Sequence, residues 1–366
     1  MTPAARLHPW SQRFNLKLLL LILAIGLGIN LVGLGHLALA VRSALSPEDF
    51  ELLLQLIGLL LLVVIPAAGI YSLVSEFAFW EGWLQGLPAP ATLFEQVPEG
   101  AQRHRCYLVY LDGIHQLERD HPPRVSAFLE LLEQQLEAET LLVRGLETYT
   151  VMPVALAEDA GSEWFWRRLF ALQEHHPNRV VQLLASVFVQ ANNVIKVGIS
   201  SDRRYGPILN YELALKISLR LAEAGFRPDC GRRIVLAGYS GGAEMAMGVA
   251  DYLRRITRAP VSIISFCGVF SGNQVLHQLT GITTIVGSKD PVAAFGRIAY
   301  PGRSPLLPLS NWNKALAAGQ IQRSLIEGMN HNGSQGPFSE AFRLRVIKAI
   351  LAALAAPTAA PAQTGC

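Results

Sequence analysis

One serine, Ser240, has glycine both two positions before it and two positions after it, in the run Gly238-Tyr239-Ser240-Gly241-Gly242. The apolar run 234–237 precedes this segment, and the helix-like stretch 243–255 follows it. A turn this tight between a strand and a helix strains its central residue, and the glycines let neighbouring chain segments approach it. The pattern predicts a strand, a sharp turn and a helix, with the Ser240 hydroxyl exposed at the start of the helix. A glycine-rich turn without chemistry is the alternative.

Two later loops supply the groups that a serine needs in order to react. Residues 282–286 are typical of a buried strand, and the turn that follows contains Asp290 before Pro291. The run 324–326 leads into a loop that contains His331. A serine hydroxyl becomes a nucleophile when an imidazole takes its proton and a carboxylate orients that imidazole. We therefore expect His331 to act as the base and Asp290 as the acid.

Each of these two residues also has an ordinary interpretation. Asp290 can cap the turn before Pro291, and His331 can be a solvated loop histidine. Asp251 and Glu327 are rival acids, although Asp251 lies well along the helix after the turn and Glu327 is close to His331 in the chain.

The glycine-flanked serine, the Gly-x-x-Asp-Pro turn and the Gly-Met-Asn-His loop, in this chain order, resemble the α/β-hydrolase superfamily over about residues 104–350. The resemblance implies an α/β fold, with a mostly parallel sheet and helices on both faces. It also implies that Ser240 is the nucleophile, Asp290 the acid and His331 the base, with Gly238, Tyr239 and Gly242 completing the nucleophile elbow.

Acyl transfer further requires two donors for the developing oxyanion. The amide of Gly241 fits the first role, because it follows the nucleophile. The strand-like run 105–111 ends in Asp112-Gly113-Ile114-His115, and the Ile114 amide is our second choice. Many members of the family have histidine where this chain has Asp112, and a carboxylate there is harmful unless it points away and is hydrogen-bonded. His115 is either a substrate contact or a surface histidine.

The amino-terminal region contains two uncharged apolar stretches, 18–40 and 52–74, of about 23 residues each. Each is long enough to cross a bilayer at about 1.5 Å per residue. A short connection predicts a helical hairpin over 18–75, and basic residues before it place both ends in the cytoplasm. We therefore expect a two-pass integral membrane protein with its catalytic domain on the cytoplasmic side. A cleaved signal peptide is the competing interpretation of the first stretch.

These segments suggest the organisation of the whole chain. Residues 1–17 precede the hairpin, 76–103 form an aromatic-rich interfacial linker, 104–355 form the globular domain, and 356–366 form an Ala/Pro-rich tail that we expect to be disordered. Within the domain, 140–143 is typical of a strand, and about 145–205 exceeds what one crossover needs and predicts a cap. A cluster of aromatic residues and two arginines at 164–170 suits a lid at a lipid interface or an ordinary packed helix.

Composition limits the remaining possibilities. About 51% of the residues are apolar and only 16% are charged, and the net charge of +3 is too small to argue for nucleic acid. The four cysteines, which have no paired metal spacing, suit a reducing compartment, and we expect neither a metal nor a cofactor. The oligomeric state is left open.

The expected function is that of a membrane-anchored serine esterase or lipase. Its partners would be the lipid bilayer and an apolar acyl-ester substrate. A thioesterase or a peptidase of the same fold is an alternative, and so is a catalytically silent membrane scaffold, which Asp112 favours.

Overall fold

The computed structural model describes residues 46–59, 62–63, 66–67, 70, 92–95, 97, 104–116, 121–149, 168–169, 171–172, 176–202, 206–228 and 231–356. The chain divides into two compact units, Met1–Pro66 and Ala67–Cys366. In the first unit the structure describes one helix, α2 (Pro47–Leu59). The second unit holds the sheet and all the predicted site residues.

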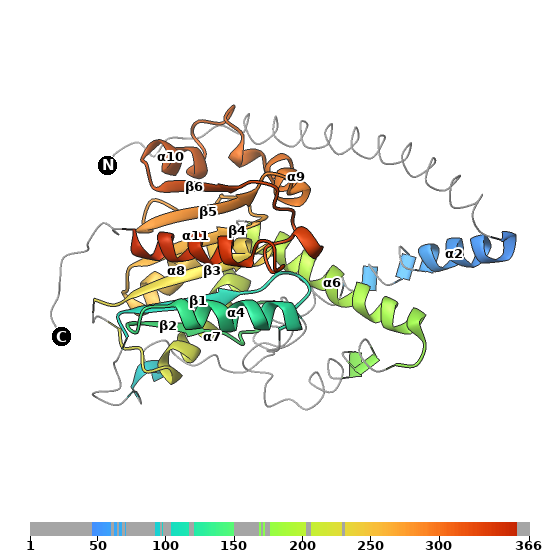
Figure 1. Ribbon diagram of the computed structural model, residues 1–366, viewed down its shortest axis with the longest axis horizontal. Coiled ribbons are helices and arrows are strands. Elements are labelled where there is room, and N and C mark those ends of the chain that lie inside the picture. The colour runs from blue at the N-terminus through green and yellow to red at the C-terminus, as the bar shows by residue number, and fades with distance from the viewer. Residues whose placement is uncertain are drawn as a thin grey trace. The chain divides into compact units, whose positions relative to one another are not determined.

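The second unit is built on six parallel strands in the order β2-β1-β3-β4-β5-β6 (Figure 1). The strands are β1 (Cys106–Leu111), β2 (Thr140–Val143), β3 (Arg233–Tyr239), β4 (Val261–Phe266), β5 (Gly281–Gly287) and β6 (Ile321–Ile326). Each neighbouring pair is parallel. The carboxyl ends of all six strands therefore lie at one end of the sheet, where ligands bind in open parallel sheets.

Helices cover both faces of this sheet, because its strands are apolar on both sides. In Figure 1, α4 and α11 lie in front of the strands, and α7 and α8 lie behind them. The helices that the structure describes in this unit are α4 (Pro123–Gln135), α6 (Arg179–Ser201), α7 (Gly206–Glu223), α8 (Gly242–Thr257), α9 (Pro291–Ala299), α10 (Asn311–Ala317) and α11 (Arg343–Ala355), with short 3₁₀ turns η2 (Thr92–Phe94), η4 (Pro301–Arg303) and η5 (Gly333–Gln335).

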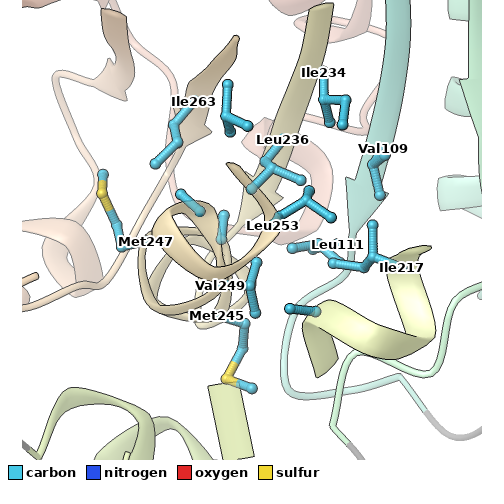
Figure 2. Close-up of a cluster of buried hydrophobic side chains, with 14 of the residues drawn as sticks. Val109, Leu111, Ile217, Ile234, Leu236, Met245, Met247, Val249, Leu253 and Ile263 are labelled. Atoms are coloured by element: carbon cyan, nitrogen blue, oxygen red, sulfur yellow. The ribbon is translucent and has the colours of Figure 1, made fainter. Parts of the chain in front are cut away.

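Alternation along β1 divides the core into two layers. Tyr107, Val109 and Leu111 join the cluster that contains α7 and α8, whereas Leu108 and Tyr110 join the cluster of α4 and α11. Figure 2 shows the first cluster, with apolar side chains of α8 facing those of β1, β3 and β4. This packing on α8 holds the start of that helix, and thus the turn at Ser240, against the carboxyl end of β3.

The expected α/β class, with a parallel sheet and helices on both faces, is confirmed. The strands expected near 105–111, 140–143, 234–237, 282–286 and 324–326 are present as β1, β2, β3, β5 and β6. The sequence interpretation did not include β4, although its residues Val-Ser-Ile-Ile-Ser-Phe form a mostly apolar run.

The first predicted span, 18–40, lies outside the described residues. The second, 52–74, is described only in part, through α2 and a few residues after it. Among the helices that the structure describes, none combines the length and apolar character needed to cross a bilayer. The predicted hairpin therefore stays a prediction, as does most of the aromatic cluster at 164–170.

Candidate active site

Ser240 lies at the turn between β3 and α8 in a left-handed backbone conformation, with φ of 51°. A non-glycine residue rarely adopts this conformation, which costs on the order of 1–3 kcal/mol. Neighbouring backbone holds it there: the Ser240 amide donates to the Phe266 carbonyl at 3.3 Å, and the Ser240 carbonyl accepts from the Val269 amide at 3.0 Å. The loop after β4 thus fixes the strained turn.

The glycines around Ser240 are sterically required. A Cβ at Gly238 would lie 2.6 Å from the Cα of Ala243, and one at Gly242 would lie 2.4 Å from the carbonyl oxygens of Leu111 and Asp112. Such distances are shorter than real contacts allow. The end of β1 can therefore approach the start of α8 only because no side chain stands between them.

Three side chains that lie far apart in the sequence meet above these strands. Ser240 Oγ lies 3.0 Å from His331 Nε2. The opposite ring nitrogen, His331 Nδ1, lies 3.0 Å and 3.1 Å from the two carboxylate oxygens of Asp290. All three side chains are buried, with Ser240 8% and His331 7% exposed, so Ser240 is less accessible than the sequence predicted and His331 is not a solvated loop histidine. This arrangement can pass a proton from the serine to the imidazole while the carboxylate fixes the ring.

Asp290 also caps helix α9. Its Oδ1 accepts hydrogen bonds from the amides of Val292 at 3.0 Å and Ala293 at 2.8 Å. Burial by itself would raise the pKa of Asp290, but the hydrogen bonds from His331 and Ala293 outweigh it and lower the pKa below its ordinary value. The capping interpretation and the orienting role are therefore compatible, since one ionised carboxylate does both.

The two rival acids are engaged elsewhere. Asp251 pairs with Arg254 at 2.9 Å and with Arg255 at 2.7 Å, all on α8. Glu327 is exposed and accepts a hydrogen bond from the Ser288 hydroxyl at 2.9 Å. Of these three acids, only Asp290 contacts the imidazole of His331.

Tyr239, the residue before Ser240, supports the histidine. Its hydroxyl donates to the carbonyl of His331 at 2.9 Å, and its ring stacks on the imidazole with centroids 5.6 Å apart. The sequence placed Tyr239 in the elbow but gave it no contact with His331. Such a contact depends on where the loop after β6 lies, which no local pattern reveals.

Gly241 and Ile114 lie next to each other beside Ser240. A Cβ at Gly241 would lie 3.0 Å from the Cγ2 atom of Ile114. In the described part of the chain, neither backbone amide donates to an acceptor. Two residues whose amides have no partner, close to a serine hydroxyl, are compatible with a site for an oxyanion.

The carboxylate of Asp112 is fully engaged by its neighbours. Oδ1 accepts from the Tyr110 hydroxyl at 2.9 Å and from the Gly113 amide at 2.7 Å, while Oδ2 lies 2.8 Å from His121 Nδ1. Asp112 and His121 are both almost inaccessible, with side chains 5% and 6% exposed. This engagement satisfies the condition that the sequence set for a carboxylate at this position.

The sequence did not single out His121. Its Nε2 accepts a hydrogen bond from the Gly145 amide at 3.3 Å, so that Nδ1 carries the proton donated to Asp112. The pair therefore joins the two ends of the connection between β1 and α4, and the bond from Gly145 adds the loop after β2. No local motif signals this, because Asp112 and His121 are nine residues apart and Gly145 belongs to another loop.

Helix α6, which lies in the predicted cap region, also borders the site. The side-chain amide of Asn193 donates to the carbonyl of Ile114 at 2.8 Å, and a Cβ at Gly241 would lie 2.9 Å from Val197. The side chain of His115, in contrast, is accessible to solvent. The surrounding protein still removes enough water to lower the pKa of this histidine. The insert thus contributes groups beside Ser240, whereas the role of His115 stays open.

Cys267 is the other reactive side chain close to these residues. Its Sγ and the nearest nitrogen or oxygen atoms of Asp290 and His331 all lie within 4.8 Å of one another, which is compatible with a metal ion. Burial and then the charge of Asp290 raise the pKa of Cys267 well above its usual range, which favours a neutral thiol beside the Asp-His pair.

Comparison with known proteins adds no family assignment. No protein-family model matches the chain, and no curated protein is detectably similar to it in sequence. The structure defines the chain as an α/β protein with a six-stranded parallel sheet. Any narrower assignment rests on the geometry around Ser240.

Proposed function

We propose that this chain is a membrane-anchored serine hydrolase that cleaves acyl ester bonds, with lipid or other apolar acyl esters as substrates. The contact that supports this proposal is the hydrogen bond between Ser240 Oγ and His331 Nε2, 3.0 Å long, with Asp290 on the far side of the ring. A strained serine, two partnerless amides and a paired histidine in one place are difficult to explain in a protein without acyl-transfer chemistry.

The proposed mechanism follows from these positions. His331 Nε2 removes the Ser240 proton as Oγ attacks the acyl carbonyl, and Asp290 stabilises the resulting imidazolium. The amides of Gly241 and Ile114 bind the oxyanion of the tetrahedral intermediate. His331 then gives the proton to the leaving alcohol, and a water activated by the same imidazole releases the acid from the acyl-enzyme.

The apolar substrate class and the membrane location rest on the amino-terminal sequence. In this proposal residues 18–75 form a transmembrane hairpin, which leaves the catalytic domain on the cytoplasmic side. The exposed leucines Leu52, Leu54 and Leu59 of α2 are compatible with a lipid environment. Val197 of α6, beside Gly241, would contribute an apolar wall for an acyl chain.

A catalytically silent scaffold is the rival proposal. Asp112 was the residue in its favour, and the hydrogen bonds around that carboxylate weaken the argument. Thioesters and peptides remain rival substrates for an active enzyme, because the elbow determines the reaction and not the acyl group.

The first experiment labels the detergent-solubilised full chain with a fluorescent fluorophosphonate. Wild type should react, whereas Ser240→Ala and His331→Ala should not. Ser218→Ala, which alters a buried serine hydrogen-bonded within α7, should react like wild type. A folded wild type that does not react would refute the hydrolase and favour the scaffold.

If the label reacts, hydrolysis of defined lipid esters in bilayers decides the substrate class. Release of fatty acid from bilayer lipid supports the proposal. Activity confined to short soluble esters, thioesters or peptides would reject its lipid part.

A further inference from the structure

Residues 291–326 contain four basic residues, Arg297, Arg303, Lys314 and Arg323, but no aspartate or glutamate. This stretch runs from α9 to β6. The stretch therefore carries four positive charges, whereas the whole chain has a net charge of only +3. A run of 36 residues with one sign of charge is unusual for an ordinary soluble surface, where both signs mix.

The same stretch exposes most of the large apolar side chains of the domain. Of the ten that are exposed within the described part of 104–356, seven belong to it: Val292, Phe295, Ile298, Leu306, Leu309, Leu316 and Leu325. Phe295 is 64% and Leu306 87% exposed. Single exposed apolar residues are normal, but a concentration of them indicates a contact surface.

These residues lie at one edge of the sheet. Figure 1 shows α9 and α10 beside β5 and β6, and β6 is the last strand on that side. The pKa of Arg303 is lowered to about 10, mainly by burial and then by the positive charges of Arg297 and Arg323. The cations of α9, η4 and β6 are therefore close enough to affect one another, and we call this region the β6 edge.

The opposite edge has a different character. Beside β2, exposed acids and bases pair, as in Glu139 with Arg105 at 3.2 Å and Glu133 with Arg144 at 3.5 Å. At the β6 edge, by contrast, the exposed Arg297, Lys314 and Arg323 have no carboxylate within 4.0 Å among the described residues. Their charges are available to an external partner.

We propose that the β6 edge docks on an anionic lipid bilayer. Exposed phenylalanine, leucine and isoleucine can enter the boundary of the acyl chains, while the neighbouring arginines and lysines pair with lipid phosphates. A second copy of this chain fits poorly, because a two-fold contact would bring the same cations against one another. A bilayer supplies both the negative charge and the apolar phase.

Helix α9 connects the β6 edge directly to the candidate active site. Asp290 is the N-cap of α9, so the apolar side chains of this helix begin two residues after the acid of the site. Docking through α9 would hold Ser240 and His331 at the lipid surface. The consequence for catalysis rests on the proposed function, but the test of membrane docking does not require catalysis.

The test places an environment-sensitive nitrobenzoxadiazole dye at Phe295→Cys in the full chain, reconstituted into vesicles. The matched control carries the dye at Leu344→Cys on α11, where the native side chain is 56% exposed. Both proteins also carry Cys230→Ser and Cys366→Ser, while Cys106 and Cys267 are buried and can stay.

In vesicles of phosphatidylcholine with phosphatidylglycerol, the dye at 295 should brighten several-fold and be quenched by spin-labelled lipid, while the dye at 344 should not. Arg297→Gln with Arg323→Gln should remove most of that increase. Equal, aqueous signals at both positions in anionic vesicles would overturn the proposal. So would an increase at 295 that occurs in detergent and grows with protein concentration, because it would indicate a second copy.

The dye experiment and the fluorophosphonate experiment can fail separately. Lipid-dependent brightening in a chain that never reacts with fluorophosphonate would preserve the docking surface and remove the hydrolase. A serine that reacts with fluorophosphonate in a chain without brightening would support the hydrolase and reject the docking surface.

Discussion

Asp290 meets His331 with a carboxylate oxygen that already accepts two amide hydrogen bonds at the start of α9. The Oδ1 atom lies 3.0 Å from His331 Nδ1, 3.0 Å from the Val292 amide and 2.8 Å from the Ala293 amide. The helix therefore orients the carboxylate, and the carboxylate orients the imidazole. Because Asp290 both caps α9 and contacts His331, substitutions of Asp290 that keep the cap and substitutions that remove it should differ in their effect on stability.

Asp290→Asn should reduce turnover of a p-nitrophenyl ester by about 10⁴-fold while changing stability little. Asparagine caps helices about as well as aspartate, but its amide donates to His331 and favours the wrong tautomer, which costs about 10⁴-fold in a related arrangement. Asp290→Ala should lose activity and also about 1 kcal/mol of stability with the cap. Steady-state kinetics and thermal unfolding measure the two effects.

Asp251→Asn is the matched control, since Asp251 pairs with arginines on α8 and should leave turnover unchanged. Turnover of Asp290→Asn within tenfold of wild type would contradict the role of Asp290.

His121→Phe should lower turnover while leaving KM nearly unchanged. The substitution keeps the ring that packs edge-to-face on Tyr110, at 5.3 Å between centroids, but removes the hydrogen bonds to Asp112 and Gly145. The Ile114 amide would then be held less firmly. Because losing one oxyanion donor costs about 10²–10³-fold in turnover, we expect a decrease of about 10- to 100-fold.

The control for His121→Phe is His104→Phe, since His104 makes a similar edge-to-face contact with Tyr107 at the other end of β1. The affinity for a trifluoromethyl ketone, whose adduct places an oxyanion in the site, should fall with turnover in His121→Phe only. If both histidine variants lose stability alone, His121 has no positioning role.

Gly242→Ala should destabilise the protein and inactivate it. Its Cβ would lie 2.4 Å from the carbonyl oxygens of Leu111 and Asp112, so that the end of β1 must move away from α8. Overpacking of this kind costs about 1–3 kcal/mol. Gly198→Ala, on the exposed side of α6 with open space around it, should instead stabilise by up to about 1 kcal/mol. Thermal unfolding of both variants measures the contrast, and equal stabilities would contradict it.

The sequence was sufficient for features that depend on local pattern. Apolar runs marked five of the six strands, and the glycines around Ser240 marked the turn, because a strained conformation leaves a local requirement for small residues. The placement of His331 and Asp290 followed from parallel strands, whose carboxyl ends share one edge.

Contacts between residues that are not close neighbours in the chain could not be predicted in this way. The Asp112–His121 pair depends on how the two ends of the connection between β1 and α4 come together, and the sequence alone made Asp112 look unfavourable. Similarly, Glu244 has the position of an ordinary first-turn helix acid, but the loop after β4 buries it completely. Burial of a polar group is a property of the packed fold.

Glu244 lies four residues after Ser240, and its carboxylate anchors the loop after β4. It accepts hydrogen bonds from the Ser271 amide, from the Ser271 hydroxyl at 3.0 Å and from the side-chain amide of Gln274. Burial has the largest influence and raises the pKa of Glu244 to about 7, although these hydrogen bonds and Arg303 act in the opposite direction.

Because the pKa is higher in the folded state than the ordinary value of 4.5, the folded state binds this proton more tightly than the unfolded state. The resulting stabilisation is complete below about pH 4.5 and is lost as the pH rises from there to about 7. At about 1.4 kcal/mol per pH unit, the loss is on the order of 3 kcal/mol.

Glu244→Gln should therefore flatten the decline in unfolding free energy between pH 5 and 7, because glutamine can accept from the Ser271 amide and donate to the Ser271 hydroxyl without a titrating proton. Urea unfolding followed by tryptophan fluorescence at several pH values measures the difference between the two proteins. Glu133→Gln, an exposed substitution on α4, should give a profile parallel to wild type. A Glu244→Gln profile that is also parallel would mean that Glu244 titrates normally in the folded protein.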